Sequence, residues 1–346
     1  MRSRLLAYRV CFLIITFFIC ALGCRETTIC RITNYTGWPD AVEMSNSKVR
    51  VVVAPSIGRI IHYGFLGKDN LLWVNSEFTG KTLPDGELFR ENGRVIWANF
   101  GGDKVWPTAQ NQFFLYNDRS WPPDVTFDGG KTEVKFLRNG IRMTSGMSPA
   151  VGARLIREIR LSANTSRLLI VQRMEKIDTA KNKQYEPVPL TIWNATQIRN
   201  PLEIIINTVP TEQYPSGHYI LPFFLRTPGN LSIENKLGFL YPDSLMPQKV
   251  SAVSDSWVAS VIDNTVFAEF FVRDSTAIYP DGNLNCKVYS EPRYAQLEVA
   301  SPLIQLVPGD AFEFTIAWDL FELADSLTSR EEKRTAALNW LKNKKL

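Results

Sequence analysis

The chain has 346 residues, 45% apolar and 12% aromatic, which is enough to bury a large core. Its formal net charge is +4, but Arg2, Arg4 and Arg9 lie before residue 24 with no acidic residue among them, so the rest of the chain is nearly neutral. A neutral surface gives no electrostatic reason to expect a nucleic-acid partner. The 20 glycines and 20 prolines are scattered and no linker or repeat divides the chain, so we expect one large domain.

The N-terminus predicts an export signal. A basic segment precedes the uncharged apolar run 10–22, which is too short to span a bilayer comfortably. The run ends in Ala21-Leu22-Gly23-Cys24, which resembles the lipobox of bacterial lipoproteins, although Leu is more usual at residue 21. This resemblance implies a signal peptide over 1–23 and a lipid on Cys24. An ordinary cleaved signal and an uncleaved anchor are the alternatives. We expect an exported protein, secreted or held at the cell envelope (periplasmic or outer-membrane face), whose membrane contact is the N-terminal lipid only.

A tether is expected over residues 24–39, followed by a single β-rich domain over 40–322. Beyond Cys24 the chain has two cysteines, Cys30 and Cys286. In an oxidising compartment they can pair as a disulfide or remain two separate thiols, and the sequence leaves both alternatives open.

Alternating apolar and polar residues predict antiparallel strands along most of the domain. The first contains Val49, Val51 and Val53. The step Asn139-Gly140 separates the alternating runs 132–136 and 141–144, and Asn-Gly favours a hairpin because both residues tolerate positive φ. The runs 153–161 and 168–176 flank the polar turn 164–166 and predict a second antiparallel pair.

Further strands are expected at 266–272 and 295–299, and after the Pro308-Gly309-Asp310 turn. Only the tail, 323–346, has a helical pattern. There Thr328 and Glu331 have the spacing of a capping box, followed by an apolar stripe. Many short strands and one terminal helix predict an all-β fold, a large antiparallel β-sandwich.

Several familiar catalytic sites are absent from the sequence. It has no G-x-S-x-G elbow and no G-x-x-x-x-G-K-[ST] phosphate loop. Its two histidines, His62 and His218, are not in metal-ligand spacing, which excludes a His-rich zinc site. We expect no cofactor and assign no metal ligand, although an oxygen-ligated Ca²⁺ would leave no compact signature.

The stretch 95–128 combines tryptophans with amide, carboxylate and amine side chains. Sugars present apolar C–H faces that stack on aromatic rings and hydroxyls that hydrogen-bond to amides and carboxylates. Core tryptophans joined by turns are the alternative, which we favour for Trp97 alone. For the cluster as a unit we predict substrate-binding residues, namely Asp103, Lys104, Trp106, Gln110, Trp121 and Asp124.

Two later segments extend this prediction. Trp193 and Gln197 are four residues apart on an expected strand and so share one face; we include both as substrate-binding, with half-buried strand residues as the alternative. Glu298 shares a strand face with Gln296 and Tyr294. The simplest interpretation of Glu298 is a solvated carboxylate on a strand face. The more specific interpretation is a catalytic or sugar-binding carboxylate. Glu298 is our candidate catalytic residue.

In this order, these three segments resemble the galactose mutarotase-like superfamily, and most of all an uncharacterised secreted bacterial family within it. The segment from Gly101-Gly102 to Trp106 is similar to one in which a histidine precedes two glycines. The strand bearing Trp193 is similar to the one bearing the mutarotase acid histidine, and Glu298 lies where mutarotases carry the base glutamate. The resemblance covers roughly residues 40–322 and implies a β-supersandwich fold that handles carbohydrate.

The departures from that family bear on the reaction. Phe100 and Trp193 stand where the two mutarotase histidines would align, and neither can protonate a ring oxygen near neutral pH. Ordinary aldose 1-epimerase chemistry is therefore not expected. We predict an exported carbohydrate-binding protein, with carbohydrate modification left open. The alternatives are a structural or protein-interaction lipoprotein, and a polysaccharide lyase or glycoside hydrolase.

Overall fold

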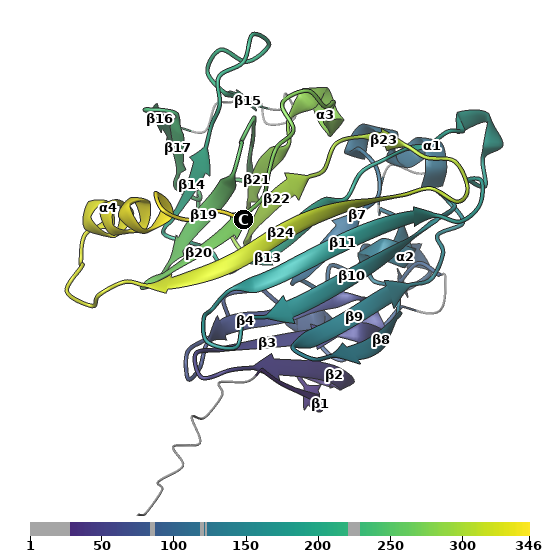
Figure 1. The fold of residues 1–346 in the computed structure, drawn as a ribbon, viewed down its shortest axis with the longest axis horizontal. Helices are drawn as coiled ribbons and strands as arrows, with labels where there is room; N and C mark the ends of the chain where they lie inside the picture. Colours follow the sequence, from purple (N-terminus) through teal and green to yellow (C-terminus); the bar gives the residue numbers. More distant parts are fainter. Residues whose placement is uncertain (1–27, 84–86, 118–120, 122, 221–228) are drawn as a thin grey trace, which may run out of the picture.

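The computed structural model describes residues 28–83, 87–117, 121, 123–220 and 229–346. Within them, strands distant in sequence form two large sheets that pack face to face (Figure 1). The first sheet contains, in spatial order, β1 (Ile29–Tyr35), β2 (Trp38–Ser45), β3 (Val49–Ala54), β4 (Arg59–Phe65), β7 (Asp103–Trp106), β13 (Trp193–Ile198), β22 (Ala295–Ala300), β21 (Cys286–Ser290), β18 (Gln248–Ala252) and β15 (His218–Ile220). The second contains β16 (Leu231–Glu234), β17 (Leu237–Leu240), β14 (Glu203–Asn207), β19 (Trp257–Ile262), β20 (Thr265–Phe270), β24 (Ala311–Glu322), β11 (Leu168–Lys176), β10 (Ala153–Leu161), β9 (Gly140–Ser145) and β8 (Thr132–Leu137).

Smaller elements lie in the connections between these strands. Two short pairs of strands are β5 (Arg90–Glu91) with β6 (Arg94–Val95) and β12 (Pro189–Leu190) with β23 (Ile304–Gln305). The helices are α1 (Phe113–Asn117), α2 (Val125–Asp128), α3 (Pro280–Asn283) and α4 (Arg330–Leu341), with single 3₁₀ turns at η1 (Pro55–Ile57), η2 (Ser76–Phe78), η3 (Gln110–Gln112) and η4 (Lys183–Tyr185).

The hairpins expected from alternation are confirmed. Strands β8 and β9 pair antiparallel up to Leu137 opposite Gly140, across the predicted Asn-Gly turn. Strands β10 and β11 pair along their whole length, from Ala153 opposite Lys176 to Leu161 opposite Leu168. The alternation also decides which side chains enter the core, since every second residue of β10 and β11 is buried.

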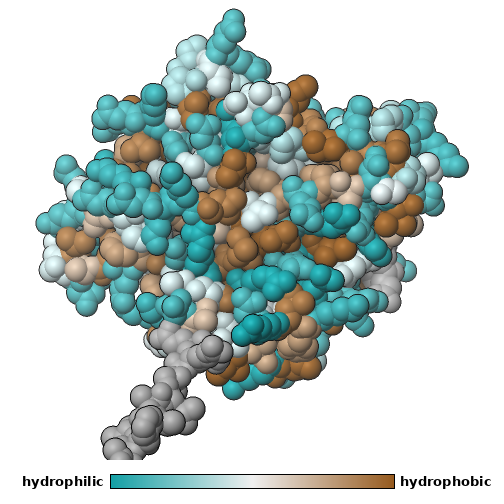
Figure 2. All heavy atoms as spheres, viewed as in Figure 1, coloured by the Kyte–Doolittle hydropathy of each residue, from teal (hydrophilic) through white to brown (hydrophobic). Residues whose placement is uncertain are grey.

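The outward face of β9, β10 and β11 carries charged side chains in cross-strand pairs. Arg142 pairs with Glu158 on the neighbouring strand, and Arg154 pairs with Glu175 at 2.7 Å. On the side of the molecule that Figure 2 shows, hydrophilic residues are widely interspersed with hydrophobic ones. Opposite charges across neighbouring strands suit a sheet face in contact with water.

The C-terminal helix is confirmed, but its cap lies one residue later than predicted. Ser329 accepts a hydrogen bond from the backbone of Glu332, whose side chain accepts one from the Ser329 backbone N–H. The sequence Thr328-Ser329 allows two registers, and the observed one buries Ala337 and Leu341 against the outer face of β19 and β20. Helix α4 therefore covers apolar surface that the second sheet would otherwise expose.

The first element of the described chain is strand β1. This strand occupies residues expected to form the tether and pairs with β2, so the sheet begins before residue 40. The signal peptide and Cys24 lie outside the described residues. Cys30 and Cys286 are free thiols, which decides between the two alternatives left open above. No helix in the described part of the chain is sufficiently long and apolar to cross a membrane.

Candidate functional site

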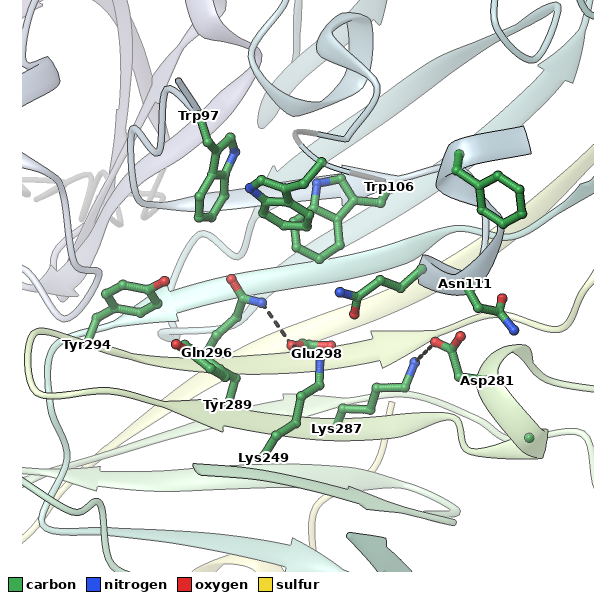
Figure 3. Close-up of a pocket in the computed structure, with 14 residues that line it drawn as sticks. Trp97, Trp106, Asn111, Lys249, Asp281, Lys287, Tyr289, Tyr294, Gln296 and Glu298 are labelled. Atoms are coloured by element: carbon green, nitrogen blue, oxygen red, sulfur yellow. Dashed lines mark hydrogen bonds and ion pairs between the residues drawn. The ribbon is translucent and has the colours of Figure 1, made fainter. Parts of the chain in front are cut away.

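A pocket of about 780 Å³ lies over the face of the first sheet that is turned away from the second sheet. Figure 3 shows tryptophans along one side of it and charged and amide side chains from β18, β21 and β22 along the other. Its lining residues come from the loop before β7, the η3–α1 segment, the α3 turn and the sheet itself. They are Trp97, Trp106, Gln110, Asn111, Phe114, Trp121, Lys249, Asp281, Gly282, Lys287, Tyr289, Tyr294, Gln296 and Glu298.

Strand register explains why residues so far apart in sequence meet here. Lys104 lies opposite Ala195, Ala195 opposite Glu298, and Glu298 opposite Lys287. These residues form one row across β7, β13, β22 and β21. Because side chains alternate along a strand, the row and its second-nearest neighbours all project to the pocket face. Intervening residues such as Val105 and Val299 project into the core between the sheets.

The aromatic wall is held in place by a buried carboxylate. Asp128 accepts hydrogen bonds from the indole N–H of Trp97 at 2.7 Å and of Trp106 at 2.8 Å. The fully buried guanidinium of Arg59 lies 3.3 Å from the same carboxylate and balances its charge. Trp121 then packs edge-on against both indoles, with ring centroids 4.8 and 5.8 Å away. Trp121 is 38% exposed, so this wall reaches solvent.

The opposite side of the pocket is a chain of polar contacts that ends at Glu298. The Lys104 amine donates to the Gln296 carbonyl oxygen at 3.0 Å, and the Gln296 amide donates to Glu298 Oε1 at 2.9 Å. Lys249 Nζ lies 3.5 Å from the same oxygen. Glu298 is 1% exposed, and its other oxygen, Oε2, has no hydrogen-bond partner among the described residues. The network thus fixes one carboxylate oxygen and leaves the second available.

A second ion pair closes the α3 side of the pocket. Lys287 Nζ lies 2.5 Å from Asp281 Oδ2 and 3.9 Å from the centre of the Trp193 ring. Asp281 has φ +52° and precedes Gly282 at φ +83°, so two successive residues adopt the left-handed region. A non-glycine residue is uncommon there, and such backbone positions concentrate at functional sites.

Burial changes the proton affinity of the amines in this region. The pKa of Lys104 is lowered to about 7, first because burial disfavours the charged form and then because Arg59 lies nearby. Burial also lowers the pKa of Lys287, against the opposing effect of Asp281. The pKa of Tyr289 is raised to about 12, mainly by burial, so its hydroxyl acts as a hydrogen-bonding group near neutral pH.

The structure brings together part of the predicted site. Trp106, Gln110, Trp121 and Glu298 line the same pocket, with Gln296 and Tyr294 beside Glu298 as alternation predicted. Lys104 lies one hydrogen bond behind the surface, through Gln296. Trp193 is buried beneath the pocket, edge-on to Trp106 at 5.1 Å between ring centroids.

Three of the predicted residues do not line the pocket: Asp103, Asp124 and Gln197. Asp103 projects between the sheets, where it pairs with Arg157 and accepts hydrogen bonds from two residues of β13. One step along a strand reverses the face, so Asp103 and Lys104 cannot share a site. Asp124 is buried as the N-cap of α2, accepting from Thr126 N at 2.9 Å. Gln197 projects to the same sheet face as the pocket, opposite Gln296, but it is fully buried and is not among the residues lining the pocket.

Besides Phe114, Gly282 and the buried Arg59, sequence reasoning missed five pocket or supporting residues: Asp128, Lys249, Asp281, Lys287 and Tyr289. Only Lys287 and Tyr289 had a usable signal, because they alternate with Cys286 and Val288 on an apolar strand. The other three sit in a turn, at a helix end and on a separate strand. No group of three or more His, Cys, Asp or Glu side chains in the described ranges is arranged to hold a metal ion.

Comparisons with known proteins agree with this geometry at the level of fold. Residues 40–218 match the model of a family described as a domain of unknown function, DUF4380. A galactose mutarotase-like protein from Lactobacillus casei shares 8% identity, with a TM-score of 0.52 over 81% of this chain and 100% of that one. A putative aldose 1-epimerase from Escherichia coli shares 12% identity, with a TM-score of 0.48 over 80% and 97% of the two chains.

No curated protein matches the sequence significantly. The family match covers more than half of the chain, and the Lactobacillus casei structure aligns with 81% of it. The predicted all-β, mutarotase-like fold is confirmed. The chain belongs to the DUF4380 family and has the galactose mutarotase-like fold.

Proposed function

We propose that the pocket over the first sheet binds a carbohydrate. One observation carries the proposal: a wall of indole rings faces a row of carboxylate, amide and amine groups across a single pocket (Figure 3). A sugar ring presents an apolar C–H face to aromatic rings and hydroxyls to polar groups at its edge. The two sides of this pocket match those two parts of a sugar.

The unpartnered oxygen of Glu298 supports the same proposal. A buried acceptor without a hydrogen bond costs about 1–3 kcal/mol. A sugar hydroxyl donating to Oε2 would remove that cost, and the Gln296 amide and Lys249 amine already hold Oε1. Glu298 is also the group suited to accept a proton in any reaction at this site.

A purely structural lipoprotein is the competing function. It predicts that Trp106, Trp193 and Glu298 lie apart, with no common cavity. Trp106 and Glu298 line one pocket, and Trp193 packs against Trp106 beneath it. This convergence favours a ligand site over a structural role alone.

Two phenylalanines of similar exposure offer a matched test. Phe114 lines the pocket and is 55% exposed, whereas Phe136 lies on β8 in the second sheet and is 51% exposed. We expect binding in a glycan array and by calorimetry to weaken about fivefold in Phe114→Ala and to stay unchanged in Phe136→Ala, since one lost stacking contact is worth about 1 kcal/mol. Absence of any glycan binding by the wild-type protein would remove the proposal.

We also propose that the protein is exported and anchored by a lipid on Cys24. The support is the charged segment, apolar run and Ala21-Leu22-Gly23-Cys24 sequence at the N-terminus. Palmitate labelling of the wild type and of Cys24→Ala tests it. Label on the wild type alone is the expected result, and an unlabelled wild type would contradict the anchor.

A further inference from the structure

Together, the described residues on the polar side of the pocket and the residue directly behind it supply three amines and two carboxylates. Among the described residues that line it, Lys249 and Lys287 are balanced in number by Asp281 and Glu298. Lys104, directly behind Gln296, adds a third amine. Asp128 and Asp103 favour its charged form, but each is also paired with a buried arginine, Arg59 and Arg157 respectively.

Lys249 and Lys287 are held close together despite carrying like charges. Their amines lie 5.7 and 3.9 Å from the centre of the same Trp193 ring. Their side chains are only 11% and 2% exposed, so water screens the repulsion between them weakly. Each has one carboxylate neighbour, which leaves further N–H donors on both ammonium groups.

Lys104 is a buried amine whose charged form is only partly stabilised by the carboxylates around it. It is fully buried and donates to the Gln296 side chain, and it forms no ion pair within the described residues. Burying a charge without a partner is unfavourable. An anion bound in the adjoining pocket would favour its charged form and would also relieve the repulsion between the other two amines.

We infer that the carbohydrate bound in this pocket is an acidic one, whose anionic group contacts Lys249 and Lys287 while a ring hydroxyl donates to Glu298 Oε2. The inference rests on the proposed function and narrows its substrate class. Glu298 does not oppose it, because the Oε1 side already faces Gln296 and Lys249 and the free Oε2 needs a donor. Both a carboxylated and a sulfated sugar have the required chemistry.

Sugars that differ only at C6 provide the test. Calorimetry would compare galacturonate, galactose 6-sulfate and galactose, with glucuronate and glucose as a second pair. We expect at least one acidic sugar to bind about tenfold more tightly than its neutral counterpart, with the preference falling as salt rises from 50 to 500 mM. The stronger of galacturonate and galactose 6-sulfate identifies the anionic group.

Lysine variants locate the effect within the pocket. Lys249→Met should bring the ratio of acidic to neutral sugar affinity close to one; the ratio is the readout, because Lys249 also contacts Glu298 and its loss can weaken binding of both sugars. The matched control is Lys135→Met, on the exposed side of β8. Equal binding of neutral and acidic sugars by the wild type would overturn the inference and leave the proposed function standing. Absence of binding by every sugar tested would overturn both.

Discussion

Buried carboxylates on the two faces of the first sheet differ in how many of their oxygens are hydrogen-bonded. Between the sheets, Asp103 is fully buried and uses both oxygens, pairing with Arg157 and accepting from Asn194 and Thr196. On the pocket face, Glu298 is equally buried but has one oxygen unpartnered among the described residues. Burial alone therefore does not mark a binding site. An unpartnered hydrogen-bonding atom on a residue that lines a cavity is the more informative sign of one.

The largest expected effect contrasts these two carboxylates directly. Asp103→Asn should lower the free energy of unfolding by about 3–5 kcal/mol, because it leaves the buried Arg157 charge without its partner. Glu298→Gln should lower it less, by about 1–3 kcal/mol, because it weakens the 3.5 Å contact with Lys249 but can keep the hydrogen bond from Gln296. Urea unfolding of both variants makes the measurement. A larger loss in Glu298→Gln than in Asp103→Asn would break the comparison.

Asp128 provides a second test of the comparison between Asp103 and Glu298. It lies beside the pocket, but both of its carboxylate oxygens accept hydrogen bonds. In Asp128→Asn, the new amide nitrogen cannot accept from an indole N–H, so one tryptophan loses its anchor. The buried Arg59 also loses the charge of its partner, so we expect a stability loss of about 3 kcal/mol together with weaker sugar binding. Tryptophan fluorescence should change as well.

Asp124→Asn is the control for Asp128→Asn. Asp124 caps the same helix, and asparagine caps helices equally well. Its tryptophan fluorescence and sugar affinity should match those of the wild type. Equal changes in the two variants would mean that the indole contacts of Asp128 do not orient the wall.

Glu269 is an interior carboxyl, and burial raises its pKa well above the ordinary 4.5, against a lowering contribution from the Thr196 side chain. Asp103 opposes its ionisation and Arg157 favours it. Above pH 4.5 the unfolded chain releases a proton that the folded chain retains, so stability falls as pH rises. Glu269→Gln removes this dependence. Its stability relative to wild type should increase by up to about 1.4 kcal/mol per pH unit, measured by urea unfolding between pH 5 and 8. A constant difference would contradict the assignment.

The smallest expected effect concerns the charge of Lys104 near pH 7. Four charged groups lie near the Lys104 amine. They are Arg59 on β4, Asp128 on α2, Asp103 on the same strand as Lys104, and Glu298 on β22. Raising the pH from 6 to 8.5 deprotonates the amine, so galacturonate affinity should fall about threefold while galactose affinity stays constant. Lys104→Met should bind galacturonate with the lower affinity at both pH values. A wild-type affinity that does not change with pH would show that Lys104 does not contribute.

Much of the fold follows from local pattern. Strands β8–β11 could be placed from alternation and an Asn-Gly step because their neighbours are also close in sequence. The order β7-β13-β22-β21-β18 could not, since apart from the consecutive pair β21 and β22 its members come from separate parts of the chain. Register between distant strands depends on the packing of the whole sheet, which no local window contains.

The site was predictable where one strand carried the signal. Alternation placed Gln296 and Glu298 on one face, and aromatic enrichment identified Trp106 and Trp121. The same enrichment wrongly grouped Asp103 with Lys104, because composition ignores which face a strand residue occupies. Lys249 carries no local signal and joins the site through sheet assembly alone.

The position of β1 at one end of the first sheet has a practical consequence. Six strand spacings of about 4.8 Å separate β1 from β22, which carries Glu298, so the chain enters the sheet roughly 30 Å from the pocket. In Figure 1, β1 and the α3 turn lie at opposite ends of the molecule. Immobilisation through the N-terminus on a sensor chip should therefore preserve ligand access, and the same geometry would hold the pocket away from any surface to which the N-terminus is attached.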